Sequence, residues 1–249
     1  MERIEITENL PDSRPFRFKK FTIYQDRCAM KVGTDGVLLG AWVETEGYSR
    51  ILDIGTGTGL LALMVAQRNP SALIDALEVD VLAFEQAQEN FSRSPWAGRL
   101  NIYHSPVQQF RPAFSYEMIV CNPPFYTHSP AMPDSPRKMA RLADNLTPEI
   151  LLDNARGLLT PNGLLQVILP IKEGKKFAEY ALNNGWYLKR RTLIKTKPHK
   201  PVSRQLIALS PSPLPGFVFE DELIIQYEAT HDYTEEFRRL LYDFYIIFD

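Results

Sequence analysis

Three glycines at alternating positions, Gly55, Gly57 and Gly59, join a strand pattern to a helix pattern. The apolar run Arg50–Ile54 predicts a buried strand, and Thr58–Arg68 predicts a helix after it. Glycine allows a tight turn and a close approach of backbone to ligand, and a helix N-terminus offers free N–H groups. The arrangement predicts an α/β fold that binds a ligand at this turn.

Strand and helix patterns continue to alternate through the middle of the chain, which predicts a parallel, doubly wound sheet. Two final strand patterns, Trp186–Ile194 and Gln205–Ser210, are joined without a helix and predict an antiparallel addition at one edge. We therefore expect a mixed sheet of seven strands with helices on both faces. The intervening strands are expected at Ala72–Leu77, Leu100–His104, Glu117–Cys121 and Leu164–Leu169, and the helices at Val81–Arg93, Thr147–Leu159 and Glu173–Asn183.

Two carboxylates accompany the glycine turn. The spacing is Gly-x-Gly-x-Gly rather than the Gly-x-Gly-x-x-Gly of dinucleotide sites, and Asp53 precedes it at the strand end. A carboxylate there suits a cationic or amino-bearing ligand better than a pyrophosphate. Glu78 ends the next strand, where it can accept both hydroxyls of a ribose. The alternative is a strand–turn–helix junction that Asp80 merely caps.

These features resemble the class I S-adenosylmethionine-dependent methyltransferases. The resemblance implies S-adenosylmethionine as the cofactor, with the three glycines and Asp53 near its amino-acid part and Glu78 and Val79 near its ribose. Many relatives hold the cofactor adenine with an Asp after the third strand. Here that stretch is His104-Ser105-Pro106-Val107, so Ser105 or a backbone group near Val107 is expected there instead.

The fourth expected strand leads into Asn122-Pro123-Pro124-Phe125. The lone pair of a base amino group is delocalised into the ring, so the nitrogen is a poor nucleophile. The Asn122 side-chain carbonyl and the Pro123 backbone carbonyl can each accept one amino hydrogen and aim the lone pair, with Pro124 stiffening the loop. Phe125 can stack on the base, and catalysis is then mainly positioning. A rigid turn with a buried Phe is the structural alternative, and Cys121 as a nucleophile for pyrimidine C5 is a chemical one.

The motif is similar to that of amino methyltransferases with Asn/Asp-Pro-Pro-aromatic. Together with Lys31–Trp42 and Met139–Leu146, it resembles the bacterial tRNA(Val)-type adenine-N6 methyltransferases, over the chain from about Phe16 onwards. That family modifies the adenine 3′ of the anticodon, which implies tRNA as partner. In it, the Lys31–Trp42 element lies over the cofactor, so Lys31, Thr34 and Asp35 become candidate pocket residues. An rRNA guanine-N2 enzyme, a glutamine-N5 enzyme acting on release factors and a non-catalytic RNA-binding protein stay open as alternatives.

Charge is unevenly distributed along the chain. The whole carries 28 basic and 30 acidic residues, so it lacks the strongly basic balance of many nucleic-acid-binding proteins. Residues 219–249 hold nine acidic and two basic residues, which leaves the rest with a net charge of +5. Phosphate contacts need basic clusters, and Phe16, Phe18 and Phe21 are expected to stack on loop bases. A solvated face is the alternative. The candidate RNA-binding residues are Arg17, Lys19 and Lys20, and a basic strip of Lys189, Arg190, Arg191, Lys195, Lys197, Lys200 and Arg204.

The remaining features bound the setting. The chain has two cysteines, which make neither a disulfide framework nor a metal-ligand spacing, and its longest apolar run, Leu60–Ala66, is too short to span a membrane. Without a secretory signal pattern, we expect a cytoplasmic monomer that uses no metal and no membrane. Residues 1–48 are expected to form an extension on the cofactor and substrate side. Residues 49–249 are expected to form the catalytic domain, with an acidic tail at 217–249 and a short helix from Thr234.

Overall fold

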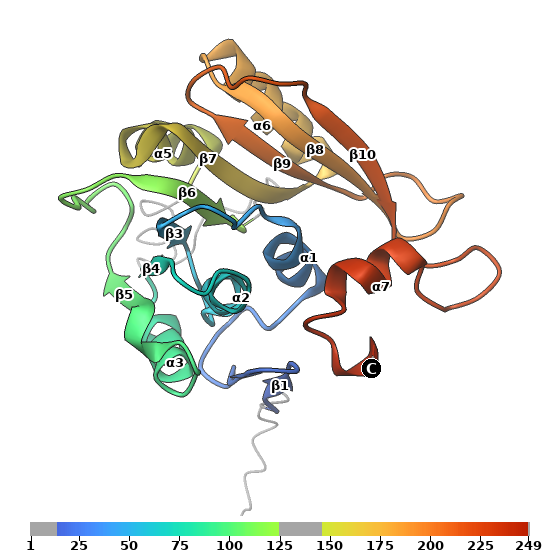
Figure 1. The fold of residues 1–249 in the computed structure, drawn as a ribbon, viewed down its shortest axis with the longest axis horizontal. Helices are drawn as coiled ribbons and strands as arrows, with labels where there is room; N and C mark the ends of the chain where they lie inside the picture. The colour runs from blue at the N-terminus through green and yellow to red at the C-terminus, as the bar shows by residue number, and fades with distance from the viewer. Residues whose placement is uncertain (1–13, 125–145, 249) are drawn as a thin grey trace, which may run out of the picture.

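An eight-stranded mixed sheet forms the centre of the computed structural model, which describes residues 14–124 and 146–248 (Figure 1). Its strand order is β10-β8-β9-β7-β6-β3-β4-β5. Neighbouring strands are parallel except where β9 pairs antiparallel with β7 and with β8. The strands are β3 (Arg50–Ile54), β4 (Leu73–Glu78), β5 (Leu100–His104), β6 (Tyr116–Cys121), β7 (Leu159–Pro170), β8 (Tyr187–Lys195), β9 (Arg204–Ser210) and β10 (Phe219–Ile224).

Helices cover both faces of this sheet, as the sequence predicted. One layer consists of α1 (Thr34–Trp42), α2 (Leu60–Arg68), α3 (Val81–Ser92) and α7 (Glu235–Leu241), and the other of α5 (Pro148–Leu158) and α6 (Ile171–Asn183) (Figure 1). Successive strand side chains point to opposite faces. Along β6, Met118 and Val120 therefore join the core on the α1–α2 side, while Ile119 and Cys121 join the core on the α5 side.

Local capping explains where several helices begin. The Thr147 hydroxyl accepts a hydrogen bond from the Ile150 N–H, directly before Pro148 at the first helical position. Asp80 caps α3 in the same way through the Ala83 N–H at 2.9 Å. The helix expected from Thr234 is α7, which that threonine caps.

The expectation of seven strands is wrong by one, because the acidic segment adds β10 to the sheet. β10 pairs parallel with β8, and Glu220 lies opposite Arg191 in this register. Phe219–Ile224 carries three acidic residues in a row and lies at the sheet edge, so it lacks the buried apolar run that revealed the other strands. Basic side chains on the neighbouring strand compensate its charge.

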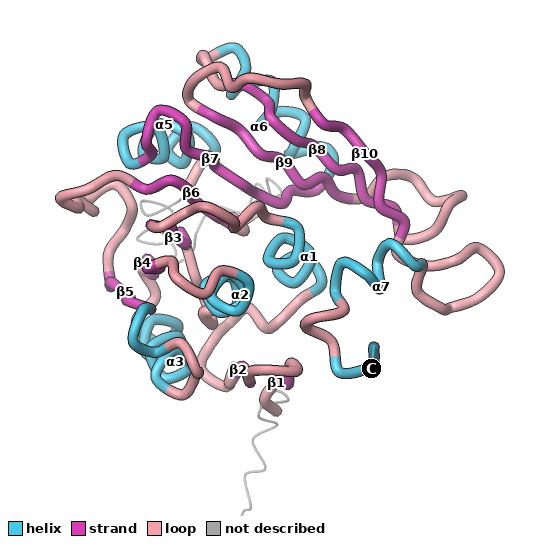
Figure 2. The backbone as a smooth tube through the Cα atoms, viewed as in Figure 1, coloured by secondary structure: helices cyan, strands magenta, loops and turns pink. Residues whose placement is uncertain are grey.

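The N-terminal aromatic residues are part of the core, so the expectation that they stack on RNA bases is wrong for Phe18 and Phe21. Both are buried, and their rings stack with centroids 4.5 Å apart. The two short strands β1 (Phe16–Arg17) and β2 (Thr22–Ile23) pair with each other, apart from the main sheet (Figure 2). A backbone hydrogen bond of 2.9 Å from the Lys19 N–H to the Phe244 carbonyl joins this segment to the C-terminal part of the fold.

Three-residue 3-10 helices at Ala97–Arg99 and Ile246–Phe248 complete the described elements. None of the helices within residues 14–124 and 146–248 has the length and apolar character that a membrane crossing requires.

Candidate functional site

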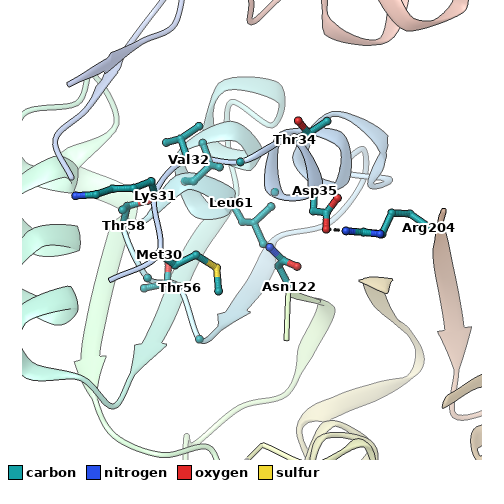
Figure 3. Close-up of a pocket in the computed structure, with 15 residues that line it drawn as sticks. Met30, Lys31, Val32, Thr34, Asp35, Thr56, Thr58, Leu61, Asn122 and Arg204 are labelled. Atoms are coloured by element: carbon teal, nitrogen blue, oxygen red, sulfur yellow. Dashed lines mark hydrogen bonds and ion pairs between the residues drawn. The ribbon is translucent and has the colours of Figure 1, made fainter. Parts of the chain in front are cut away.

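A cavity of about 510 Å³ opens where β3 and β6 end (Figure 3). Ligands of open α/β sheets bind at the carboxyl edge of the parallel strands, and the cavity occupies that edge. It brings together seven residues singled out from the sequence: Lys31, Thr34, Asp35, Gly55, Gly57, Asn122 and Arg204. It also includes Met30, Val32, Gly33, Gly36, Thr56, Thr58, Leu60 and Leu61, which the sequence interpretation left out although most of them flank its motifs.

The glycine turn serves two purposes. Gly55 and Gly57 have φ angles of +71° and +57°, and a Cβ added to either would meet nothing within 4 Å. Their bare backbone therefore faces open space in the cavity wall. Gly59, at φ +84°, is different, because its Cβ would lie 2.5 Å from a ring carbon of Phe91. That glycine lets α3 pack closely and does not line the cavity.

Glu78 ties the end of β4 to the glycine turn. Its carboxylate accepts hydrogen bonds from the Gly57 N–H at 2.8 Å, the Val79 N–H at 2.8 Å and the Asp80 N–H at 2.9 Å. The side chain is buried and lies beside the cavity rather than in its wall. A carboxylate has about four acceptor sites, so these three bonds leave it able to accept one hydroxyl.

Asp53 supports the turn from beneath. It is fully buried, and its Oδ2 accepts from the Thr56 hydroxyl at 2.5 Å and the Ala62 N–H at 3.2 Å. Its Oδ1 is buried without a hydrogen-bond partner among the described residues. Burial raises the pKa of this carboxyl to about 7, against the lowering effect of those hydrogen bonds. The structure thus places Asp53 under the cavity floor, not in contact with the cavity.

Asn122 leaves β6 and enters the cavity (Figure 3). Its Oδ1 is buried and accepts no hydrogen bond from the described part of the chain. Such an acceptor fits a ligand that brings an N–H donor. Pro123 is buried and Pro124 exposed, whereas Phe125 and all of the Met139–Leu146 motif except Leu146 lie outside the described residues.

The alternative chemistry through Cys121 finds no support. The thiol is buried in the core on the α5 side, and burial raises its pKa well above the ordinary value. A buried, protonated thiol is not a nucleophile. Among residues 14–124 and 146–248, no three His, Cys, Asp or Glu side chains gather to hold a metal ion.

The residues expected near the cofactor adenine lie at the ends of β4 and β5, outside the cavity lining. Val79 is half-exposed, and its carbonyl is hydrogen-bonded to Nε2 of His104 at 2.9 Å. The Ser105 N–H donates to the Glu78 carbonyl at 3.1 Å, while Val107 is buried. These hydrogen bonds join the end of β4 to the end of β5, beside the Glu78 carboxylate.

The basic strip is divided among several partners. Arg191 forms an ion pair with Glu220, and Lys195 pairs with Glu222 at 2.9 Å. Arg190 lies over the Trp42 ring, and burial lowers its pKa. Lys189 and Lys197 donate to backbone carbonyls, Lys19 lies over the Tyr242 ring, and Arg17, Lys20 and Lys200 are exposed.

The strip therefore does not form one uniformly basic face. The acidic β10 begins fifteen positions after Arg204, the last residue of the strip, and the fold places it directly beside β8. Within the described residues, Arg204 is the member of the strip that reaches the cavity, where its Nε donates to Asp35 at 2.8 Å.

Comparisons with known proteins identify the fold and the family. A family model described as "methyltransferase small domain" matches residues 29–183. A predicted O-methyltransferase from Agrobacterium tumefaciens shares the fold with a TM-score of 0.65 at 18% identity, over 84% of this chain and 96% of that one. A structure from Listeria monocytogenes described as a class I S-adenosylmethionine-dependent methyltransferase superposes with a TM-score of 0.53 at 13% identity, over 76% and 62% of the chains.

The fold and the site define a class I methyltransferase whose cofactor is S-adenosylmethionine. The bare glycine backbone and the buried Asn122 acceptor fit that cofactor and an amino-bearing substrate beside it. Proteins from Tolumonas auensis (44% identical, covering 93% of this chain and 96% of theirs) and Bacteroides fragilis YCH46 (45% identical, 94% and 99%) are named tRNA1(Val) (adenine(37)-N6)-methyltransferase. The chain belongs to this family of tRNA methyltransferases.

Proposed function

We propose that this protein transfers a methyl group from S-adenosylmethionine to N6 of an adenine in the anticodon loop of tRNA(Val), at the position 3′ of the anticodon. The names of its relatives support the substrate. The observation in the site that carries the proposal is Oδ1 of Asn122, which lines the cavity and is buried without a hydrogen-bond partner among the described residues. The substrate implies an enzyme that works in the cytoplasm.

Asn122 and Pro123 would prepare the amino group for attack. The bound cofactor supplies a methyl group on a positively charged sulfur. Oδ1 of Asn122 accepts one hydrogen of the adenine amino group, and the Pro123 carbonyl accepts the other. These two acceptors direct the nitrogen lone pair away from the ring. No base is needed before attack, because the nitrogen loses its proton only after it has gained positive charge. Pro124 fixes the loop, and Phe125 stacks on the base.

The cofactor would extend from the cavity toward the ends of β4 and β5. Gly55, Gly57, Lys31 and Thr34 would surround the amino-acid end, in the cavity that they line, whereas Asp35 lines the part of that cavity beside Arg204. The acceptor site that Glu78 retains is suited to a ribose hydroxyl. Asp53 and Gly59 act from behind the turn, and Val79, Ser105 and Val107 form the adenine end.

Nucleoside mass spectrometry tests the reaction. The purified protein is incubated with S-adenosylmethionine and an unmodified tRNA(Val) transcript, which is then digested to nucleosides. We expect N6-methyladenosine, and none from a transcript with guanine in place of the target adenine. N2-methylguanosine from ribosomal RNA, or methylation of a release factor without any tRNA product, would contradict the proposal and favour the guanine-N2 or glutamine-N5 alternative.

A further inference from the structure

Arg204 reaches the active edge of the sheet because β9 runs against its neighbours. In an antiparallel strand the first residue lies at the edge where the parallel strands end, and Arg204 pairs with Pro170, the last residue of β7. Along the sheet edge where the parallel strands end, the spatial order is β4 with Glu78, β3 with the glycine turn, β6 with Asn122, β7, and then β9 with Arg204. Arg204 thus lies on the opposite side of Asn122 from the cofactor-binding elements.

The close-up shows the same division. Lys31 and Thr56 lie on one side of Asn122, and Asp35 and Arg204 on the other (Figure 3). Since a methyl acceptor must approach the cofactor from the side that the cofactor does not occupy, Arg204 is placed in the half of the cavity that the substrate enters. The side chain is 36% exposed, so it is open to a ligand.

The Arg204 guanidinium is held in one orientation. Its Nε donates to the Asp35 carboxylate at 2.8 Å, and its Nη1 donates to the Ser203 carbonyl at 3.0 Å. A guanidinium has five N–H donors in a rigid plane, so these contacts engage two of them within the described part of the chain. A guanidinium that is already oriented and still has unused N–H donors can bind an oxyanion with little further loss of side-chain entropy.

Other members of the basic strip form ion pairs away from the cavity. Arg191 and Lys195 are paired with carboxylates of β10, at a part of the sheet beyond Arg204. Among the described residues, Arg204 is therefore the cation that lines the cavity on the substrate side of Asn122. A nucleotide whose base enters beside Asn122 brings the phosphates on either side of it to the mouth of the same cavity.

We propose that Arg204, oriented by Asp35, binds a backbone phosphate adjacent to the nucleotide that is methylated. This inference rests on the proposed function and specifies how the enzyme holds its RNA substrate. Arg204 is thereby a substrate-binding residue, and Asp35 is a positioning residue that acts through it.

An RNA with one neutral linkage tests the proposal directly. Anticodon stem–loops are made with a methylphosphonate in place of the phosphate on the 5′ or the 3′ side of the target adenine. With the wild-type protein, one of these should lower kcat/KM about tenfold, the usual loss for one hydrogen bond to a charged group. For the Arg204→Ala variant, kcat/KM on the natural RNA should be about tenfold below wild type. Replacing the phosphate by the neutral linkage should then lower it little further. Arg204→Lys, which keeps the charge but not the fork, should lie between.

Two further measurements separate this role from a structural one. The affinity of Arg204→Ala for S-adenosylmethionine, measured by calorimetry, should stay within about twofold of wild type. The salt dependence of RNA binding should lose a slope of about 0.7–0.9, which corresponds to one phosphate contact. Arg93→Ala, which removes an arginine paired with Glu89 on α3, is the matched control and should change none of these values.

The outcomes discriminate clearly. If Arg204→Ala weakens the cofactor while the neutral linkage still costs its full effect, the bound anion is the cofactor carboxylate and the proposal is overturned. It is also overturned if no quantity changes, since the ion pair is then structural only. A wild-type protein that methylates no adenine would instead refute the proposed function.

Asp35 is tested through the same RNA. Asp35→Asn keeps an oxygen acceptor for Nε of Arg204 and should retain most of the sensitivity to the neutral linkage. Asp35→Ala removes the acceptor and should reduce the sensitivity to the neutral linkage. Full sensitivity in Asp35→Ala would show that Arg204 needs no such partner.

Discussion

The Thr56 hydroxyl donates a hydrogen bond to the Asp53 carboxylate across 2.5 Å, with both side chains buried beneath the glycine turn. The other carboxylate oxygen is buried without a partner among the described residues, which makes the charged form costly. The turn that forms the cavity wall therefore lies on a carboxyl group whose ionisation opposes folding.

Replacing Asp53 by Asn should remove a pH dependence of stability. Burial raises the pKa of Asp53 from 3.8 to about 7, so the folded state binds the proton more tightly than the unfolded chain. The resulting stability is complete below about pH 4 and is lost as pH rises to about 7. Across that range, wild type should lose on the order of 2–4 kcal/mol of unfolding free energy relative to Asp53→Asn.

Urea unfolding at a series of pH values measures this difference. The exposed Asp232→Asn serves as the control for the loss of one carboxylate and should follow the wild-type curve. Parallel curves for wild type and Asp53→Asn would mean that the Asp53 pKa is not raised.

Gly55→Ala should impair cofactor binding through a mechanism that Gly47→Ala does not share. Both glycines have similar φ angles, +71° and +78°, and neither Cβ would meet an atom within 4 Å, so each alanine costs about 1–2 kcal/mol of backbone strain. Only Gly55 lines the cavity. We expect Gly55→Ala to raise the dissociation constant of S-adenosylmethionine at least about tenfold, measured by calorimetry, and Gly47→Ala to leave it unchanged. Equal effects would show that strain alone is responsible.

Asn122→Ala should reduce turnover far more than cofactor affinity. The amide aligns the amino group without contributing most of the cofactor contacts, so kcat should fall about 10²–10³-fold, as for the loss of other positioned polar groups. The cofactor dissociation constant should change by less than about threefold. Asn154→Ala, on α5 and outside the cavity, is the control. Turnover of Asn122→Ala within about tenfold of wild type would rule out the proposed role.

Removing the carboxylates of β10 should free the basic side chains of β8 with which they now form ion pairs. In the double variant Glu220→Gln, Glu222→Gln, Arg191 and Lys195 lose their carboxylate partners. Both pairs are partly exposed, so the unfolding free energy should fall by less than about 1 kcal/mol per pair. The salt dependence of tRNA binding should become steeper, by up to about 0.7–0.9 for each freed charge that reaches a phosphate. An unchanged slope would place this part of the sheet away from the RNA.

Most of the sheet could be predicted because its signals are local. Arg50–Ile54 and Leu100–His104 are strands with the predicted bounds, since each is a short run closed by turn residues or a helix. The strand at Phe219–Ile224 could not be predicted in this way. What stabilises it beside β8 is the pairing of its carboxylates with residues of β8, about thirty positions earlier in the sequence.

The site shows the same contrast. Asn122 and the glycine turn were predicted from contiguous motifs, and the structure brings them to one cavity. Arg204 stood out only as one cation among many, because its place in the cavity depends on the antiparallel direction of β9. Asp53 is buried because β3 lies in the middle of the sheet with helices over both faces, so that all of Ile51–Ile54 is buried, and no local motif reveals this central position.

The packing of α7 against α1 connects the C-terminal part of the chain to the cavity wall. The first turn of α1 supplies Thr34 and Asp35 to the cavity wall, while α7 lies on the same helix. A ligand that immobilises the start of α1 should therefore damp the opening motions of α7, a segment that it never touches. Hydrogen–deuterium exchange would reveal this as slower exchange of the amides in Glu235–Leu241 when S-adenosylmethionine is bound.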